Sequence, residues 1–524
     1  MWQRFFYIFF IFIFTLVLGI SYIWPNGLYF LIIITPLFIV GIVDTFSKNN
    51  VLYNYPVIGH IRYLMEFISP EIRQYFLEDD KSGRPYNREQ RDLIKKRSEG
   101  DLGIHPFGTE NDILTRGYSF ALHSMGVKEV PEEASRIIVG GPQCLQPYKS
   151  SRLNISAMSF GSLSANAVLA MNKGAYLGGF SQDTGEGGLT DHHLKYGADL
   201  VWEIASAYFG CRTPEGRFDD EVFSQKANLK VVKMVIIKLS QGAKPSSGGF
   251  LPGVKVTKDI ARYRGIPVGV DCKSPAVHPE FNTPRGLLEF VARLRHLCGG
   301  KPIGFKLCIG KRSDFLGICK AMLETGILPD FICIDGAEGG TGAANSELSD
   351  YLGLALDEAI PFVHSSLVGC NLRQHIKLLV SGKIVDGFDM VQKIALGADF
   401  CNVARPMMFA VGCIQAMRCH TGNCPTGVTT QDPRRARAID VDTRAIHVKN
   451  FHHETIKSFL RLVGTLGLDH PDKLSPSIIW QQLGEQKAKT YAELYDYLTS
   501  GILLSDSIPE YVLEDWNQAN ADRY

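Results

Sequence analysis

The amino-acid sequence predicts an α/β protein built on a (β/α)8 TIM barrel, with an N-terminal transmembrane hairpin and helical flanking regions. From Ser151 onward, eight short apolar runs end in glycine-rich or polar clusters, and helix-like segments follow most of them. Eight strand–helix units over roughly 280 residues match the size and repeat of such a barrel. The runs expected to form its strands are 153–162, 178–188, 231–245, 266–275, 302–310, 329–342, 375–384 and 398–406.

One interval between the expected strands is unusually long. More than forty residues separate the glycine-rich cluster 185–188 from the run 231–245, and they contain none of the eight runs. A loop of this length is commonly functional, as a lid or a partner contact. A structural insertion explains it equally well, so both interpretations stay open.

Residues 1–47 predict a transmembrane helical hairpin. Residues 5–24 are uncharged, and a helix of that length, rising about 1.5 Å per residue, covers the ~30 Å hydrocarbon core. A second apolar run, at about 28–44, follows the turn-forming sequence Pro25-Asn26-Gly27. The alternative is a secretory signal peptide, but there is no small-x-small cleavage site and a second apolar run follows at once.

Charges flank this hairpin at its two ends. Arg4 precedes the first run, Lys48 and Arg62 follow the second, and the turn carries none. By the positive-inside rule both ends face the cytoplasm. We therefore expect the protein in the inner (cytoplasmic) membrane, with its catalytic domain facing the cytoplasm.

The rest of the chain divides into three expected regions. Residues 48–150 are mixed and charged and should pack on the barrel, residues 151–431 should form the barrel with a cysteine-rich segment, and residues 432–524 look helical. The formal net charge of +1 gives no field that points to nucleic acid as a partner.

Two groups of residues stand where barrel chemistry is expected. The loops after the seventh and eighth strands commonly bind phosphate. There, Ser381, Gly382 and Lys383 offer backbone N–H groups and one cation, and Arg405 offers another. Lys306 lies inside the run 302–310, where burial is costly unless the ammonium meets an anion, such as the negative charge of a reduced flavin. The alternative is a lysine that extends to solvent.

Further polar and cationic residues lie in or near the end of the run 231–245, the expected third strand. Lys238, Gln241 and Lys244 lie at its end, and Arg264 lies close by in sequence. Several cations around one barrel mouth suit a small dicarboxylate substrate.

Three of the twelve cysteines fall within twelve consecutive residues, at Cys413, Cys419 and Cys424. An odd number of thiols cannot all pair as disulfides within the group. A structural zinc site wants four ligands, and His420 is poorly placed to share a metal with its neighbour. Cys424-Pro425 repeats the Cys-Pro ending of iron–sulfur segments, which favours an iron–sulfur cluster while leaving zinc open.

The segment from about Ser151 to Asp432 resembles the flavin-binding synthase domain of glutamate synthase. The Cys-x5-Cys-x4-Cys spacing and the residues after it are the most specific part of the resemblance. The resemblance covers a little over half of the chain, and the remaining soluble part looks like the smaller, membrane-anchored proteins of this family that lack a glutaminase domain. The motifs that carry the resemblance are SAMSFGSLS, DTGEGG, QGAKPSSGGFLPGVKV, DGAEGGTGA and CIQAMRCHTGNCPTGVTTQ.

The resemblance implies two cofactors, FMN and a [3Fe–4S] cluster, the latter on Cys413, Cys419 and Cys424. It implies that Glu186, Lys244 and Arg264 line the substrate site, and that Lys306, Glu186 and Gln241 are catalytic. The residues that it implies for FMN binding are Ala157, Met158, Ser159, Gln241, Lys306, Ser381, Gly382 and Lys383. We add Arg405 from its position after the eighth strand, where the loop departs from the family pattern.

The implied reaction is reductive. Electrons pass from the cluster to FMN and then as hydride to 2-iminoglutarate, formed from 2-oxoglutarate and ammonia, to give glutamate. There is no GxGxxG dinucleotide fingerprint, so we expect the electrons from ferredoxin, an NAD(P)H-oxidising subunit or the membrane.

Three departures from the family pattern bear on this function. The chain begins with a membrane helix where the full enzymes carry a glutaminase domain, the eighth-strand loop reads VARP, and Phe250 stands where the family has a substrate-binding glutamine. One alternative is a reductase of another 2-oxo or imino acid, with Phe250 selecting an apolar side chain. Another is a non-catalytic electron-relay subunit, which would not need the cations Lys244 and Arg264.

Overall fold

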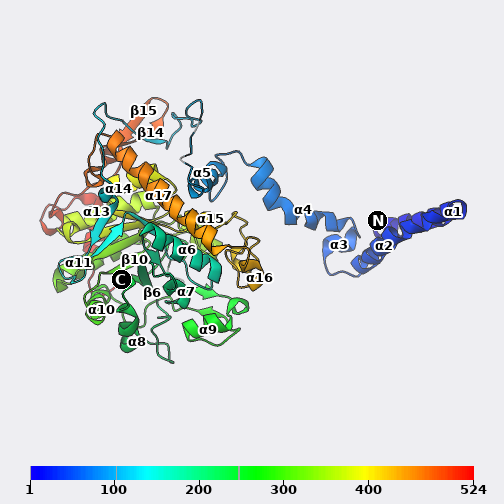
Figure 1. Cartoon of the computed structure of the whole chain (residues 1–524), viewed down its shortest axis with the longest axis horizontal. Helices are drawn as coiled ribbons and strands as arrows, with labels where there is room; N and C mark the ends of the chain where they lie inside the picture. The colour runs from blue at the N-terminus through cyan, green and yellow to red at the C-terminus, as the bar shows by residue number, and fades with distance from the viewer. Residues whose placement is uncertain (1, 102, 105, 246–247) are drawn as a thin grey trace. The chain divides into compact units, whose positions relative to one another are not determined.

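The computed structural model describes residues 2–101, 103–104, 106–245 and 248–524. The chain divides into two compact units, one ending at Glu89 and one beginning at Gln90 (Figure 1). The expected flanking region 48–150 is therefore shared between them. Its first part belongs with the N-terminal helices, and its second part belongs with the barrel.

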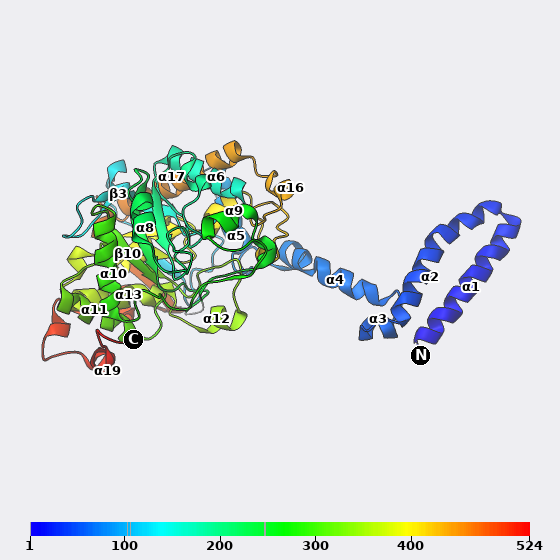
Figure 2. The ribbon, with the colours of Figure 1, turned by 90° about the horizontal axis from the view of Figure 1, so that it is seen from below.

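The N-terminal unit contains the expected helical hairpin (Figure 2). Two apolar stretches, Trp2–Ile23 and Pro25–Thr45, are long and apolar enough to cross a membrane, with mean hydropathy 2.4 and 2.2. The ring of Phe38 packs 5.8 Å from that of Phe6, which joins the two stretches. The helices of this unit are α1 (Trp2–Ile23), η1 (Pro25–Phe30), α2 (Leu31–Thr45), α3 (Asn50–Asn54), α4 (Gly59–Ile72) and η2 (Arg73–Leu77).

The second unit is built around a closed barrel of parallel strands, which confirms the predicted fold class. The strands in chain order are β4 (Leu153–Ile155), β5 (Gln182–Asp183), β6 (Leu200–Ile204), β7 (Val232–Lys238), β10 (Ile303–Leu307), β11 (Phe331–Asp335), β12 (Lys377–Ser381) and β13 (Phe400–Val403). The helices between and after them are α6 (Ala165–Gly178), α7 (Asp191–Leu194), α8 (Asp220–Ala227), α10 (Pro284–Leu297), α11 (Arg312–Thr325), α13 (Leu356–Gly369), α14 (Gly387–Ala395) and α15 (Arg405–Ala410).

One predicted strand is wrong. The run 266–275 contributes only β9 (Cys272–Lys273), which pairs antiparallel with β8 (Phe250–Leu251) outside the barrel. Its valines, Val268 and Val270, are exposed, so they do not supply the buried apolar face of a barrel strand.

The missing barrel strand is β6, and it lies in the long interval before residue 231. That interval is therefore neither a lid nor a simple insertion, because it also contains α8. The strand β7, expected as the third, is the fourth.

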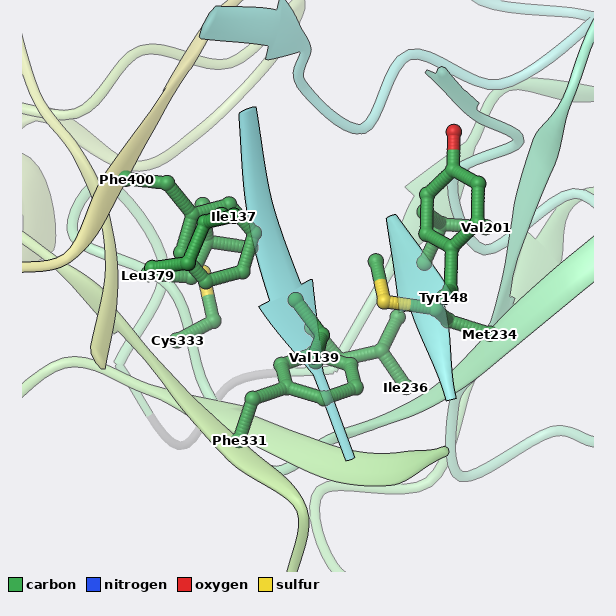
Figure 3. Packing of buried hydrophobic residues seen from close by; sticks show 10 residues of the cluster. All are labelled: Ile137, Val139, Tyr148, Val201, Met234, Ile236, Phe331, Cys333, Leu379 and Phe400. Carbon is green, nitrogen blue, oxygen red and sulfur yellow. The ribbon is translucent and has the colours of Figure 1, made fainter. Parts of the chain in front are cut away.

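The N-terminal end of the barrel is closed by a hairpin from the flanking region. Its strands are β2 (Arg136–Val139) and β3 (Tyr148–Ser151). Figure 3 shows side chains of this hairpin meeting those that point into the barrel from its strands. The interior is therefore a packed apolar core, so chemistry is confined to the other end. The residues of this core are Ile137, Val139, Tyr148, Val201, Met234, Ile236, Phe331, Cys333, Leu379 and Phe400.

The C-terminal region packs against the barrel helices and is not wholly helical. Its long helix α17 (Val441–Thr465) contacts α6 and α14, and two strands follow it. The strands β14 (Ile479–Gly484) and β15 (Lys487–Thr490) form a three-stranded sheet with β1 (Ser119–Ala121). The remaining helices of this unit are α5 (Arg88–Ser98), α9 (Lys258–Arg264), α12 (Ser346–Tyr351), α16 (Pro433–Ala436), α18 (Tyr491–Leu494) and α19 (Glu510–Gln518).

Candidate active site

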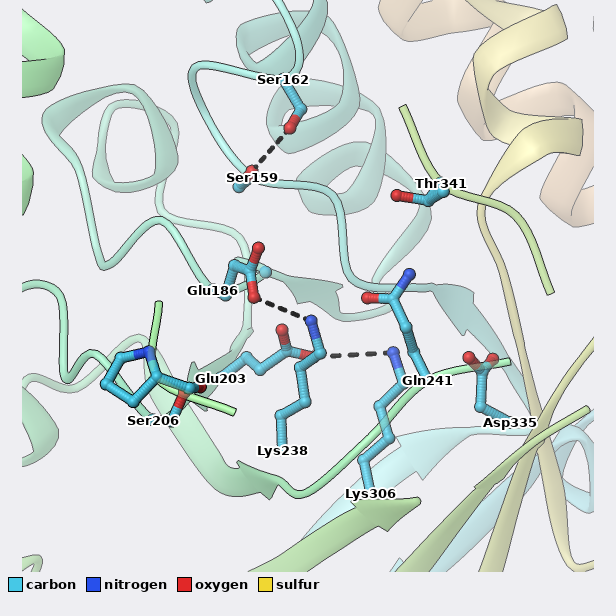
Figure 4. Close-up of polar contacts among 12 residues, drawn as sticks. Ser159, Ser162, Glu186, Glu203, Ser206, Lys238, Gln241, Lys306, Asp335 and Thr341 are labelled. Atoms are coloured by element: carbon cyan, nitrogen blue, oxygen red, sulfur yellow. Dashed lines mark hydrogen bonds and ion pairs between the residues drawn. The ribbon is translucent and has the colours of Figure 1, made fainter. Parts of the chain in front are cut away.

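A layer of polar side chains covers the apolar core at the carboxyl ends of the strands. Alternate residues of a strand face the same side, so strands whose earlier residues enter the core also point their last residues into the barrel. The register of the strands supports this, because Asp335 of β11 lies opposite Ser381 of β12, and Ser381 lies opposite Asn402 of β13. Figure 4 shows several of these side chains converging at the mouth. The members of this polar layer are Asp183, Glu203, Lys238, Lys306, Asp335, Ser381 and Asn402.

Lys306 lies in the middle of this layer and does not extend to solvent. Its side chain is buried, and its Nζ lies 3.6 Å from Oε2 of Glu203. Burial by itself would lower the pKa of Lys306, but the carboxylates of Asp335, Glu203 and Asp183 outweigh it and raise the pKa. The residue therefore remains an ammonium ion at physiological pH.

Asp335 joins three loops of the mouth. One carboxylate oxygen accepts a 2.9 Å hydrogen bond from the backbone N–H of Gly242, and the other accepts one from the hydroxyl of Ser381. Gly242 has to be glycine, because a Cβ there would lie 1.9 Å from the carbonyl oxygen of Gly336. This close contact holds the loop of the predicted catalytic residue Gln241, whose Nε2 donates to the Gly340 carbonyl at 3.4 Å.

Next to the polar layer lies a narrow cleft with one carboxylate among cations. Oε2 of Glu186 lies 2.8 Å from Nζ of Lys238, and both residues line the cleft with Lys244. Burial alone would raise the pKa of Glu186, but Lys238, Lys244 and Arg264 lower it to about 2. Glu186 is therefore ionised, and the cations around it outnumber it. Such a cleft favours an anionic ligand.

Arg264 supports this cleft from the end of helix α9. Its side chain is only 4% exposed, and its guanidinium carbon lies 4.9 Å from the centre of the Phe209 ring. Its Nη2 donates a long 3.5 Å bond to the Phe160 carbonyl, and its Nη1 donates a weak 3.9 Å bond to Sγ of Cys272. Its Nε has no hydrogen-bond partner in the described part of the chain. A buried guanidinium with so little hydrogen bonding is suited to receive a carboxylate.

The segment predicted to lie against a flavin follows β4 directly. Met158 and Ser159 are buried, and Ala157 is half-buried. Gly185 has φ +64°, and a Cβ on it would lie only 2.6 Å from the backbone nitrogen of Ser159. The DTGEGG loop therefore packs directly on this segment and brings Glu186 beside it.

The predicted phosphate residues are gathered where β11, β12 and β13 end. Lys383 is exposed and adopts a left-handed backbone with φ +46°, a strained conformation for lysine. Arg405 donates from Nη2 to the Glu338 carbonyl at 2.9 Å. With the strand-end loop of Ser381 and Gly382, these two cations form a donor set that fits a phosphate.

The three clustered cysteines are free thiols that influence one another. Burial, together with the charges of Cys419 and Cys424, raises the pKa of Cys413 to about 12. Hydrogen bonds to Cys424 outweigh its burial and lower its pKa to about 7. Nζ of Lys255 donates to the Cys419 carbonyl at 2.5 Å, which attaches the segment to the η4 turn (Gly253–Lys255).

The three thiols are not arranged as a site for a single metal ion. Within the described ranges, no three His, Cys, Asp or Glu side chains are gathered closely enough to hold one metal ion. A zinc site needs its sulfurs about 2.3 Å from one point. An iron–sulfur cluster binds each thiolate through a different iron, so its ligands stand farther apart.

Phe250 does not lie in the cleft. Its side chain is 43% exposed, and Nζ of Lys273 stands 6.0 Å from the centre of its ring. Neighbouring Gly248 and Gly249 do line the cleft. The structure therefore gives no support to the hypothesis that Phe250 selects an apolar substrate. Ser246 and Ser247 of the same motif lie outside the described residues.

Four members of the mouth are absent from the predicted site residues. Asp183 and Asp335 open the motifs DTGEGG and DGAEGGTGA, so their positions at strand ends were the available signal. Asn402 had the same signal, because it lies one residue before the end of β13, whereas Lys238 was predicted at the mouth. Glu203 was missed because its strand β6 was missed.

Comparison with known proteins assigns the chain to the glutamate synthase family. The family model described as a conserved region in glutamate synthase matches residues 131–469. The glutamate synthase large subunit-like protein YerD of Bacillus subtilis (strain 168) is 35% identical over 465 residues, 81% of this chain and 88% of that protein. The archaeal-type glutamate synthase (NADPH) of Thermotoga neapolitana is 32% identical over 320 residues, 61% of this chain and 60% of that protein.

A more distant relative and a solved structure complete the comparison. The glutamate synthase large subunit-like protein of Rhizobium meliloti (strain 1021) is 28% identical over 385 residues, 70% of this chain and 83% of that protein. A mutant flavocytochrome b2 with pyruvate bound is 14% identical, covers 83% of this chain and 98% of that chain, and has a TM-score of 0.44, too low to bear on function.

The fold and the mouth define a (β/α)8-barrel enzyme with a cation-rich site for an anionic ligand. Sequence matches over most of the chain assign it further. The chain belongs to the glutamate synthase family and is an oxidoreductase of the type that acts on CH–NH2 groups.

Proposed function

We propose that this protein is an FMN- and iron–sulfur-dependent glutamate synthase that reduces 2-iminoglutarate, formed from 2-oxoglutarate and ammonia, to glutamate. The observation that carries the proposal is the cleft in which Glu186 is surrounded by Lys238, Lys244 and Arg264, next to the buried ammonium of Lys306. An electron-relay subunit would have no use for such a cleft.

The cations of the cleft suit the two carboxylates of a five-carbon dicarboxylate. Arg264 offers a planar guanidinium for bidentate binding, and Lys244 offers a point charge. Burial lowers the pKa of Lys244, although Glu186 opposes that change, so a bound carboxylate would stabilise its charged form. Glu186 remains ionised beside the ligand and would orient the nitrogen of the imine through a hydrogen bond.

FMN would lie over the polar layer, against the backbone of Ala157, Met158 and Ser159. Its phosphate would be held by Ser381, Gly382, Lys383 and Arg405, and its ring would meet Gln241 and Lys306. When bound, FMN supplies the hydride chemistry that the amino-acid side chains lack. The part of Lys306 is to hold a positive charge where negative charge develops, in a site from which water is excluded.

Cys413, Cys419 and Cys424 would hold a [3Fe–4S] cluster that receives electrons from a donor protein. Ferredoxin or an NAD(P)H-oxidising subunit is the proposed donor, in keeping with the name of the Thermotoga neapolitana relative, which includes NADPH. Because the cysteine segment follows β13 and α15, a cluster there would be near the phosphate end of the flavin site.

The N-terminal hairpin would anchor the enzyme in the inner membrane, with the barrel in the cytoplasm. Support comes from the length and hydropathy of α1 and of the stretch Pro25–Thr45. The charges of Arg4 and Lys48 at the outer ends of the hairpin support this orientation.

The test is a substrate screen with the reduced, FMN-loaded enzyme. We expect 2-oxoglutarate plus ammonium to reoxidise the flavin faster than pyruvate or other 2-oxo acids with ammonium. Arg264→Met should raise the KM for 2-oxoglutarate about 10-fold or more, since the loss of one charged hydrogen bond costs roughly 1.5–3 kcal/mol.

The matched control is Arg262→Met on the same helix. Arg262 is exposed, and its Nη2 is 3.1 Å from Asp191, away from the cleft. The KM of Arg262→Met for 2-oxoglutarate should equal that of the unmodified enzyme. A preference for another 2-oxo acid, or equal KM values for the two variants, would reject the proposed substrate.

A further inference from the structure

Glu203 is a buried acid with an incomplete set of interactions. It is 2% exposed, and its Oε2 has no hydrogen-bond partner among the residues that the structure describes. The nearest cation to that oxygen is Lys306, at 3.6 Å, an ion-pair distance too long for a hydrogen bond. A carboxylate in this state costs free energy, so it calls for an explanation.

Asp183 lies beside Glu203 on the neighbouring strand. It is equally buried, and its strand position pairs with Val201, two residues before Glu203 on the same inward face. The backbone N–H of Glu203 donates to the hydroxyl of Thr184, the residue after Asp183, at 3.1 Å. The two carboxyl groups therefore lie on adjacent strands, face the barrel interior and are near enough for their charges to interact.

The positive and negative charges around Asp183 and Glu203 do not balance. The other groups that act on the pair are Lys306 from β10, Asp335 and Cys333 from β11 and Lys238 from β7. Lys238 is engaged by Glu186, which leaves Lys306 to offset Asp183, Glu203 and Asp335. Two neighbouring buried carboxylates under such an excess of negative charge do not both ionise.

The titration of the pair follows the same reasoning. Burial and the charge of Glu203 raise the pKa of Asp183 to about 8, although Lys306 opposes the rise. At pH 7 the pair therefore carries one proton and one negative charge.

We propose that Asp183 and Glu203 form a carboxyl pair that holds one exchangeable proton beneath Lys306, and that Glu203 positions the Lys306 ammonium toward the mouth. The protonated pair keeps the charge of Lys306 available to the ligand above it. Above pH 8 the O–H bond of the pair breaks and the proton goes to water. The second carboxylate then competes with the ligand for the positive charge of Lys306. The catalytic part of this proposal rests on the proposed function.

The first test measures the proton itself and does not depend on the substrate. Infrared difference spectra of the full-length protein between pH 6.5 and 9.5 report protonated carboxyl groups by their C=O stretch. We expect a band that is lost around pH 8 and that is absent from Asp183→Asn and from Glu203→Gln. In the latter, Asp183 loses the neighbouring charge and ionises at lower pH.

Two comparisons make that measurement specific. Asp389 is a second buried carboxyl, whose pKa burial raises to about 7, so its band must persist in both variants. Glu280→Gln is the matched control, because Glu280 is paired with Arg217 at 2.9 Å and Arg293 at 3.0 Å outside the mouth. A band near pH 8 that remains in both Asp183→Asn and Glu203→Gln would overturn the proposal.

The second test is the pH profile of kcat with 2-oxoglutarate and ammonium. We expect the unmodified enzyme and Glu280→Gln to lose activity as the pH rises through about 8, and Asp183→Asn and Glu203→Gln to lack this alkaline limb. A purely structural role would lower the rate without moving the limb, and that result would reject the proton pair. If no 2-oxo acid is reduced, the proposed function fails while the infrared result still decides the pair.

Discussion

Replacing Gly185 with alanine tests the contact between the loop of Glu186 and the segment 157–159. At this position φ is +64°, and the new Cβ would lie 2.6 Å from the Ser159 nitrogen and 2.9 Å from the Met158 carbonyl carbon. Both neighbours are backbone atoms, so no side chain can rotate away to relieve the overlap. The two loops have to separate.

The free-energy cost of Gly185→Ala has two parts. A left-handed backbone costs a residue with a Cβ about 1–2 kcal/mol, and forced overpacking in a close-packed region costs about 1–3 kcal/mol more. Gly197→Ala is the matched control, because Gly197 has φ +76° and no atom within 4 Å of its Cβ position. The overlap alone should therefore make Gly185→Ala less stable than Gly197→Ala by about 1–3 kcal/mol.

The assay is the dissociation constant of FMN, measured by the recovery of its fluorescence on release, with denaturant unfolding alongside. If the displaced segment 157–159 contacts the flavin, Gly185→Ala should bind FMN roughly 5- to 150-fold more weakly than Gly197→Ala, as 1.4 kcal/mol is tenfold. Equal affinities and equal unfolding midpoints in the two variants would refute the reasoning.

Four further predictions concern the site. Lys238→Met should lower the free energy of unfolding by about 1–3 kcal/mol, because Glu186 loses its 2.8 Å partner while Lys244 and Arg264 remain near it. Adding Glu186→Gln should recover part of this loss, and a double variant no more stable than the single one would contradict the reasoning. The pKa of Glu186 is held at about 2, below its usual 4.5, so the stabilisation from its charge is complete above pH 4.5 and is lost as the pH falls toward 2. The difference in unfolding free energy between the unmodified protein and Lys238→Met should therefore shrink in acid. Cys419→Ser should abolish the EPR signal of an oxidised [3Fe–4S] cluster while FMN stays bound, and an unchanged signal would exclude this thiol as a ligand. Lys306→Ala should slow flavin reduction by about 10²-fold in stopped-flow absorbance, and an unchanged rate would remove its electrostatic role.

Local patterns carried most of the fold prediction. Seven of the eight expected runs contain a barrel strand, because a strand buried on both faces reads as a short apolar run with turn residues after it. The run 266–275 has that composition but lies at the surface, where its valines are exposed to solvent and are not covered by helices. Leu200–Ile204 was hidden inside an interval that looked like a loop.

The site was predicted in part for the same reason. Strand-end position marks Lys306 and Ser381 from the sequence alone, because the carboxyl ends of barrel strands meet at one mouth. The ion pair of Lys306 with Glu203 joins residues more than a hundred positions apart, so no local pattern contains it. The exposed position of Phe250 likewise depends on how β8 pairs with β9.

The sequence by itself determined the barrel class, the apolar hairpin, the cysteine spacing and the residue types around the mouth, because periodicity, hydropathy and spacing are local properties of a chain. Only the tertiary structure decided which charges meet. It set Glu203 below Lys306 and placed Lys238 against Glu186, and so made a buried proton pair and a cation-rich cleft from residues on separate strands. The physical reason is that electrostatic energy depends on distance and burial, which closure of the barrel creates and which the order of residues along the chain does not record.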